Sequence, residues 1–311
     1  MALGTDQVTT SVANNFIPEL WSDEVIDAYK SNLVVANLVT KLNHKGKKGD
    51  TIHIPVPSRG SASVKAANAQ VTLSAATNTV VDVSINKHYE YSKLIEDIAE
   101  VQSLASMRKF YTDDAGYALA KQVDTDLIDL GEGFQGGSTT DGSYTKAYIG
   151  SGTSAYWSGT NEADITDAGL RALILLLDNA DVPMDNRSLI IPPICANDLL
   201  GINRFTEQAY IGSGDALRTG KIGQIYGIDV YVSTNCDTTG SGGGTGSSGG
   251  GDERVGILMH KDALVLAEQV GVRSQTQYKQ EYLGDLFTSD TIYGVKELRN
   301  DAGVAFVVKS S

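Results

Sequence analysis

The fold is decided by residues 101–130, which read VQSLASMRKFYTDDAGYALAKQVDTDLIDL. Apolar side chains recur in this stretch at the spacing of one face of an α-helix, and they are Leu104, Met107, Phe110, Tyr111, Ala115, Ala118, Leu119, Val123, Leu127 and Leu130. Ser103 is a suitable N-cap. Because a helix rises about 1.5 Å per residue, this one would be about 45 Å long. We therefore expect a spine on which other elements pack.

The segment before the spine, residues 48–90, predicts a long two-stranded β-ribbon. Residues 51–57 read TIHIPVP, and a second alternating apolar run covers residues 81–85. The prolines cannot donate ladder hydrogen bonds, so the first strand is an edge strand. Residues 58–78 are rich in Ser, Ala, Asn and Thr and offer little to bury. An isolated ribbon is marginally stable in water, so we expect this one to lean on a neighbouring copy.

The remaining pattern predicts an α+β chain, in which a compact unit of helices and strands follows the spine. The expected elements are a helical N-terminal segment over 16–42, a loop at 131–162, a helix at 166–179, a buried strand at 188–191, a helix from 196, core strands at 228–232 and 255–259, and long antiparallel strands between 270 and 311.

A glycine tract lies between the two expected core strands. Eight of the twelve residues from Gly240 to Gly251 are glycine. The tract contains G-x-G-x-x-G from Gly244 and G-x-S-x-G around Ser248, which are typical of dinucleotide sites and of hydrolases. Both motifs need a strand before them and a helix after them. Here a strand-like run follows, so the tract is interpreted as a flexible loop.

Other candidate chemistry is weak, so we expect no metal, no cofactor and no catalysis. The four histidines, His44, His53, His88 and His260, lack the short spacing of zinc ligands, and Cys195 and Cys236 are remote from them. Two cysteines indicate no disulfide framework. Three aspartates, Asp124, Asp126 and Asp129, are expected on a solvated face of the spine.

The charge balance argues against a dedicated nucleic-acid binder. The net charge is −13, whereas phosphate binding depends on clustered Lys and Arg. One cationic cluster, Lys41, Lys45, Lys47 and Lys48, is the candidate for contact with phosphate or an acidic partner, and its alternative is a solubilising segment. The start of the chain does not resemble a signal peptide, and no apolar run is long enough to cross a membrane.

Several strings, in this order, resemble the major capsid proteins of tailed bacteriophages, which have the Hong Kong 97 type fold. They are NFIPELW at 15–21, LVVANLV at 33–39, KGDTIHIP at 48–55, ALAKQVDTDL at 118–127, DVP at 181–183, Arg187, and IIPP at 190–193.

The resemblance implies a domain plan. It consists of an N-terminal arm at 1–47, an extended loop at 48–90, a peripheral domain with the spine at 91–162, an axial domain at 163–265 that includes the Gly-rich loop 237–252, and return strands of the peripheral domain at 266–311. The implied function is self-assembly into hexamers and pentamers of an icosahedral virion capsid around double-stranded DNA. Folding and assembly would take place in the cytoplasm of the bacterial host.

The resemblance also implies partners and assembly residues. The partners are other copies of the chain, a separate scaffolding protein, a portal and, in some shells, a cement or decoration protein, while packaged DNA is contacted non-specifically. The expected assembly residues are Trp21, Lys45, Lys47, Lys48, Arg59 and Lys65. Some family members link a loop lysine to a neighbour's asparagine, here Lys65 to Asn300. The alternatives are an encapsulin-type nanocompartment shell protein and a soluble hydrolase that uses Ser248.

Overall fold

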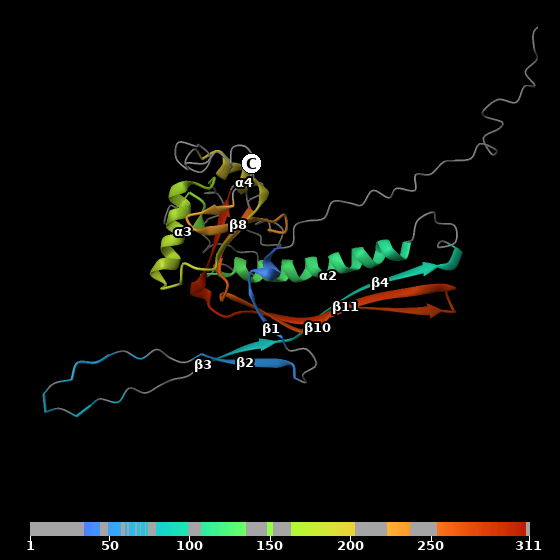
Figure 1. Cartoon of the computed structure of the whole chain (residues 1–311), viewed down its shortest axis with the longest axis horizontal. Helices are drawn as coiled ribbons and strands as arrows, with labels where there is room; N and C mark the ends of the chain where they lie inside the picture. The colour runs from blue at the N-terminus through green and yellow to red at the C-terminus, as the bar shows by residue number, and fades with distance from the viewer. Residues whose placement is uncertain are drawn as a thin grey trace, which may run out of the picture.

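The computed structural model describes residues 34–43, 49–56, 60, 62–65, 67–68, 70–71, 73, 79–98, 107–134, 148–151, 163–202, 223–236 and 254–308. The expected arm up to residue 33, the cationic segment 44–48 and the Gly-rich loop lie outside these residues. The described residues form two β-sheets, a separate two-stranded ribbon and one long helix (Figure 1).

A four-stranded sheet carries the long helix. Its strands are β1 Thr40–Asn43, β4 Lys87–Glu96, β10 Leu264–Lys279 and β11 Gly284–Glu297. They lie in the order β1-β10-β11-β4, with β1 parallel to β10 and the other pairs antiparallel. The helix α2, Met107–Glu132, runs along one face of this sheet (Figure 1). The predicted spine is therefore confirmed for the described residues.

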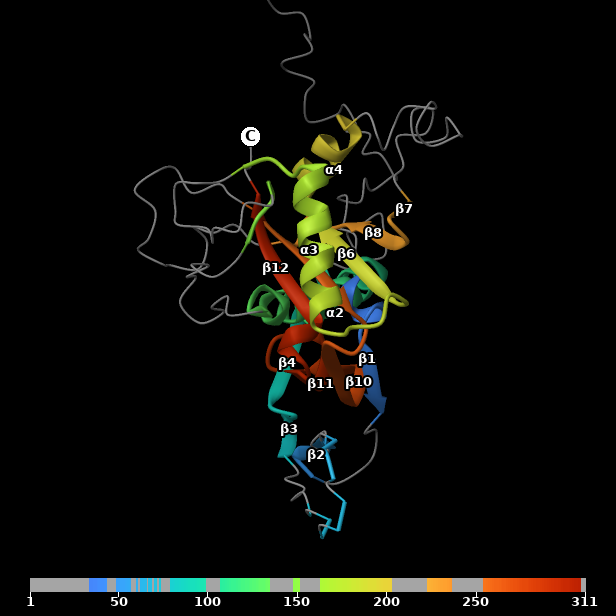
Figure 2. The same cartoon turned by 90° about the vertical axis from the view of Figure 1, so that its left-hand side faces the viewer.

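A six-stranded sheet forms the second body. Its strands are β5 Tyr148–Ile149, β6 Arg187–Ile191, β7 Gln224–Ile225, β8 Ile228–Val232, β9 Arg254–His260 and β12 Gly303–Val308. The order is β5-β12-β9-β6-β8-β7. Two helices, α3 Asp167–Asn179 and α4 Pro193–Leu200, accompany this sheet (Figure 2). The α+β class is thus confirmed.

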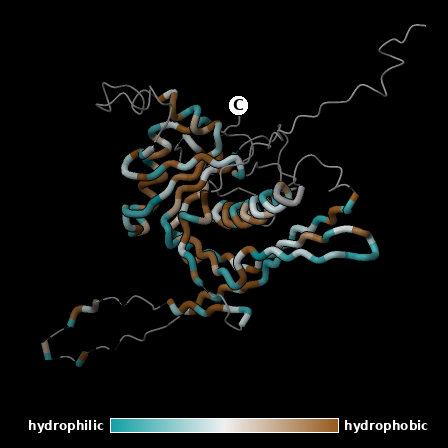
Figure 3. The backbone as a smooth tube through the Cα atoms, turned by 45° about the vertical axis from the view of Figure 1, so that its right-hand side comes forward, coloured by the Kyte–Doolittle hydropathy of each residue, from teal (hydrophilic) through white to brown (hydrophobic). Residues whose placement is uncertain are grey.

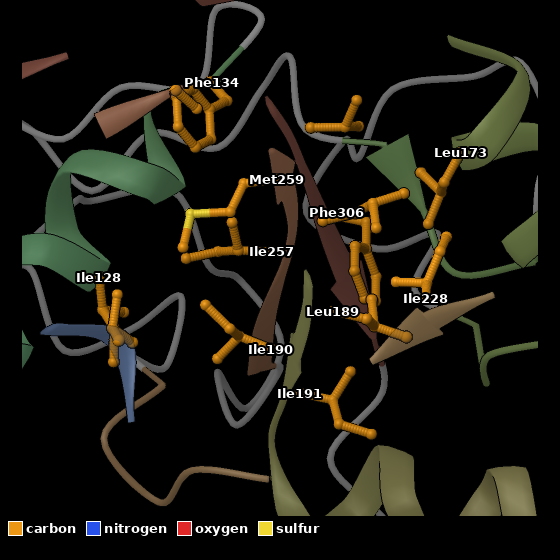
Figure 4. Packing of buried hydrophobic residues seen from close by; sticks show 14 of the residues in the cluster. Ile128, Phe134, Leu173, Leu189, Ile190, Ile191, Ile228, Ile257, Met259 and Phe306 are labelled. Atoms are coloured by element: carbon orange, nitrogen blue, oxygen red, sulfur yellow. The ribbon is translucent and has the colours of Figure 1, made fainter. Parts of the chain in front are cut away.

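One hydrophobic core joins the spine to the six-stranded sheet. Leu127 and Ile128 of α2 belong to the same buried cluster as Leu189 of β6 and Phe306 of β12 (Figure 4). The close approach requires a glycine, since a Cβ on Gly303 would lie 2.3 Å from the Phe134 ring. The end of α2 is therefore fixed to β12, and the spine projects from that anchor.

The ribbon extends away from both sheets (Figure 1). It consists of β2, Thr51–Val56, and β3, Thr79–Ser84, which pair antiparallel. Its base is buried within the same chain, because Val83 and Ile85 are 0% and 8% exposed and pack with Val265 and Ala267 of β10. Beyond the base, the described residues 60–73 are exposed.

Most described elements begin and end near their predicted positions. The helix expected at 166–179 is α3, and the Oγ of its N-cap residue Thr166 accepts a hydrogen bond from the Gly169 N–H at 3.1 Å. The buried strand expected at 188–191 is β6. The helix expected from 196 begins three residues earlier, at Pro193, because proline fits the first turn of a helix.

Two predictions are wrong in part. The helical pattern over 16–42 does not continue to its end, where a short 3₁₀ helix η2, Val35–Asn37, precedes the strand β1. Pairing with β10 outweighs the local periodicity there. The last return strand, β12, pairs with β9 in the six-stranded sheet instead of joining β10 and β11. A second 3₁₀ helix, η4 Asn300–Ala302, redirects the chain between the sheets.

Candidate assembly surfaces

Asp124, in the C-terminal half of α2, connects three parts of the chain. Its Oδ1 accepts hydrogen bonds from the backbone N–H groups of Val35 (2.8 Å) and Ala36 (3.4 Å), at the start of η2. Its Oδ2 accepts from the Asn235 amide at 3.1 Å, in the turn after β8. Burial raises the pKa of the Asp124 carboxyl, although these hydrogen bonds oppose the shift. The start of η2 is thereby held to the spine and to the turn after β8.

Asp126 ties the start of β4 to the spine. Its Oδ2 accepts the Tyr293 hydroxyl at 2.6 Å and forms an ion pair with Lys87 Nζ at 2.9 Å. Burial raises the pKa of Tyr293, so its hydroxyl stays protonated and can donate. Tyr89 stacks on Tyr293 with ring centroids 5.9 Å apart. Since Lys87 begins β4 only a short step after β3 ends at Ser84, this cluster fixes the direction in which the ribbon leaves the body.

The prediction that these aspartates lie on a solvated face of the spine is therefore wrong for Asp124 and Asp126. Asp124 and Asp126 are 0% and 5% exposed. The sequence did carry a signal for their burial: both stand among apolar residues in the interior of the helix, where aspartate is a poor helix former. Sequence reasoning missed their role because the hydrogen-bond donors come from segments about 90 to 170 residues away in the chain.

The ribbon beyond its base exposes apolar side chains. Val64, Val71 and Leu73 are 101%, 64% and 92% exposed, and Lys65 lies among them with its side chain in solvent. Closer to the body, His53 Nδ1 and Asp82 Oδ1 lie 2.6 Å apart across the two strands. The described part of the ribbon tip thus exposes three apolar side chains among small and polar ones, on a stem of two paired strands.

An apolar groove of about 460 Å³ lies between the spine and the four-stranded sheet. Its lining includes Leu119 and Val123 from α2, Leu266 and Val272 from β10, and Tyr293 from β11. Figure 3 shows brown, hydrophobic stretches in α2 and in the inner part of the adjoining strands, among white and teal ones. The groove has room for a few apolar side chains of another segment.

A polar cluster lies farther along the four-stranded sheet. Arg273 donates two hydrogen bonds of 2.7 Å to the Asp290 carboxylate, and His88 Nε2 lies 3.1 Å from the same carboxylate. The hydrogen bond from Arg273 is the largest cause that lowers the pKa of Asp290. This cross-strand cluster joins β10, β11 and β4.

No catalytic arrangement emerges from the part of the chain that the structure describes. It contains no group of three or more His, Cys, Asp or Glu side chains that could hold a metal ion. Both cysteines are free and buried, and burial raises the pKa of Cys236 to about 12. Such a thiol is protonated at neutral pH and is a poor nucleophile. Ser248 lies outside the described residues.

Of the residues predicted for assembly, the structure places only the two of the possible cross-link. Lys65 is exposed in the ribbon, and Asn300 is exposed at the start of η4. The other predicted positions lie outside the described residues, namely Trp21, Lys45, Lys47, Lys48 and Arg59. Within the described ranges, no helix combines the length and apolar character needed to span a membrane.

A family model described as "Phage capsid protein" matches residues 23–291. No curated protein sequence matches the chain. Among solved structures, one from Mycobacterium phage Che8 has 25% sequence identity and a TM-score of 0.74, over 94% of this chain and 97% of that one. The capsid of Cyanophage P-SCSP1u has 18% identity and a TM-score of 0.76, over 99% and 97%.

A third similar structure, the capsid asymmetric unit of Cyanophage Pam1, has 15% identity and a TM-score of 0.71, over 99% of each chain. The resemblance to the Hong Kong 97 type fold is therefore confirmed. Neither the nanocompartment alternative nor the hydrolase alternative is favoured by these matches.

Proposed function

The chain belongs to the phage capsid protein family, and we propose that it forms the hexamers and pentamers of an icosahedral shell around double-stranded DNA. It is a structural capsid subunit and not an enzyme. The finer proposal concerns how the copies meet and what they enclose.

The observation that carries the proposal is the exposed tip of the ribbon. Val64 and Leu73 are 101% and 92% exposed, and exposed apolar side chains on a projecting arm favour contact with another molecule. The base of the ribbon, in contrast, is already buried on its own chain through Val83 and Ile85. The stem is thus oriented by the subunit itself, while the tip is left for a neighbour.

The length of the ribbon supports a contact between its tip and a neighbouring copy. Twenty-two residues separate the end of β2 at Val56 from the start of β3 at Thr79. Half of that stretch extends at most roughly 35 Å, at about 3.3 Å per residue. A tip at that distance from its own sheet is well placed to lie on an adjacent subunit.

The test is assembly of the purified chain. Electron microscopy should show rings, sheets or closed shells. A variant in which residues 60–73 are replaced by a short Gly-Ser turn should retain a cooperative thermal transition but form no shells. The matched control replaces Val64 and Leu73 by Ile and Met, which keep the tip apolar, and it should assemble. A monodisperse monomer under all assembly conditions would contradict the proposal.

A covalent link between Lys65 and Asn300 of neighbouring copies is part of the same proposal. Lys65 is exposed in the ribbon, as a reacting amine must be. Its neutral Nζ would attack the Asn300 side-chain carbonyl, forming an amide and releasing ammonia. Denatured particles should then contain covalent oligomers, whose masses lack one ammonia per link. Only monomer mass in boiled particles would reject the link.

The proposed partners beyond the shell itself are a scaffolding protein, a portal and, in some shells, a decoration protein, with assembly in the host cytoplasm. A net charge of −13 supports only non-specific contact with packaged DNA, because an acidic wall repels phosphate. Mass spectrometry of precursor and mature particles from infected cells would identify these partners. Particles containing this chain alone would reject them.

A further inference from the structure

We propose that the apolar groove between the spine and the four-stranded sheet is the docking site of residues 16–30 of the same chain. The inference goes beyond the proposed function, because it concerns the unassembled subunit and does not require a shell. The groove has a volume of about 460 Å³, and Ala36 and Asn37 of η2 belong to its lining. The chain that precedes η2 therefore arrives beside the groove.

The lining of the groove is apolar and is covered only in part. Leu119 of α2 and Leu266 of β10 are 3% and 8% exposed. Val272 of β10 belongs to the same lining, yet 53% of its surface is exposed. An apolar segment that covered Val272 would remove this surface from water, which is favourable. The groove thus favours an occupant with apolar side chains.

Residues 16–30 carry such side chains in a suitable pattern. They read FIPELWSDEVIDAYK and lie outside the described residues, so the pattern comes from the sequence. Trp21, Val25 and Tyr29 recur every four residues, which places them on one face of a helix. Asp23 and Asp27 fall on the other side of that helix. An apolar face would enter the groove while the carboxylates stay at its rim.

The charges of the groove complement those of the segment. Residues 16–30 contain four carboxylates and one lysine. Lys41 and Glu268 line the groove, and the exposed Lys121 follows the lining residue Ala120 on α2. Three further cations follow β1 within five residues of the sequence, namely Lys45, Lys47 and Lys48. The cations outnumber the carboxylate, so they favour an acidic occupant.

The same charges disfavour the ribbon tip of another copy as the occupant. Residues 57–78 contain Arg59 and Lys65 and no carboxylate, so the lysines of the groove repel them. Residues 31–34 are all that separates the acidic segment from η2, a link that spans at most about 14 Å. A short tether gives an effective concentration on the order of millimolar. In dilute solution the segment of the same chain therefore occupies the groove first.

Tryptophan fluorescence of the full-length chain tests the docking. The chain has two tryptophans, so a Trp157→Phe background leaves Trp21 as the reporter. In dilute, unassembled subunits, acrylamide should quench Trp21 about threefold or more weakly than in a synthetic peptide of residues 16–30, because apolar side chains cover a docked indole. Val272→Glu places a carboxylate in the groove and should raise the quenching to that of the peptide.

Two controls separate docking from a general loss of structure. Val232→Glu changes a valine that is 37% exposed on β8 of the six-stranded sheet, and it should leave the quenching of Trp21 unchanged. The double variant Asp23→Lys/Asp27→Lys should raise the quenching as Val272→Glu does, whereas Asp23→Glu/Asp27→Glu, which keeps the charges, should not. All of these variants should melt within a few degrees of the background chain.

Three results would overturn the inference. Trp21 could be quenched in the unassembled subunit as strongly as in the peptide. Its protection could appear only as the subunit concentration rises, which would assign the groove to a segment of another copy. Val232→Glu could also raise the quenching as much as Val272→Glu does. Failure of the chain to form shells would contradict the proposed function and leave these measurements unaffected.

Discussion

At the scale of single residues, Asp124 organises the junction between η2, the spine and the six-stranded sheet. We predict that Asp124→Ala lowers the free energy of unfolding by roughly 2–4 kcal/mol, because a buried donor at Val35 and partly buried donors at Ala36 and Asn235 lose their acceptor. Urea denaturation of the unassembled subunit measures this loss.

Two further variants of α2 serve as controls for Asp124. Asp124→Asn retains one acceptor oxygen and should lose less than half as much stability. Asp113 is exposed on the same helix, so Asp113→Ala should change the free energy of unfolding by no more than about 0.5 kcal/mol. An equal loss in all three variants would indicate a general effect on the helix.

Asp290 gives a pH-dependent prediction at the same scale. Its pKa is lowered from 3.8, mainly by the hydrogen bond from Arg273, so the folded protein binds that proton less tightly than the unfolded chain does. The resulting stabilisation is complete above pH 3.8 and disappears as the pH falls through the lowered pKa. The stability difference between the wild type and Asp290→Asn should therefore be larger at pH 6 than near pH 3. A difference that does not depend on pH would contradict this assignment.

At the scale of elements, Gly294 decides how closely the ribbon base crosses β11. A Cβ there would lie 2.3 Å from the Ser84 carbonyl oxygen and 3.0 Å from the Ile85 Cα, and backbone atoms cannot rotate away. We predict that Gly294→Ala destabilises the subunit by about 2 kcal/mol. Hydrogen exchange should also become faster in β3. Thermal melting and exchange mass spectrometry are the measurements.

The spine offers a control with the opposite sign. Gly116 lies within α2, and the Cβ it would carry would have no atom within 4 Å apart from its chain neighbours and the backbone of its own helix. Since alanine favours helix by up to about 1 kcal/mol over glycine, Gly116→Ala should stabilise the subunit. If Gly294→Ala also stabilised the subunit, the close contacts at the ribbon base would not contribute to its stability.

At the scale of the whole molecule, charge opposes assembly while apolar contacts drive it. Copies with a net charge of −13 repel one another, and salt screens that repulsion. We predict that raising the ionic strength lowers the protein concentration at which shells form, as followed by light scattering. Close to the pI of 4.7 the salt effect should vanish. Assembly weakened by salt at pH 7 would instead indicate contacts made by charge pairs.

Local patterns predicted the elements in which the spacing of apolar residues matches the side that is buried in the folded chain. The apolar stripe of the spine and the helix at 166–179 are recognisable because helix signals depend on neighbours three or four residues apart. The strand β1 is not, since its extended form depends on β10, more than 200 residues away. For the same reason, the sequence pattern groups β12 with the strands β10 and β11. In the folded chain it pairs with β9 of the six-stranded sheet.

The sequence by itself determined the spine, the ribbon, the α+β class and the family resemblance, because each depends on local periodicity or on ordered short strings. Only the tertiary structure decided that Asp124 and Asp126 are buried and that each connects the spine to distant segments of the chain. Those features depend on donors and packing partners that the folded chain brings together from distant segments. Pairing at long sequence separation leaves no local periodicity to detect.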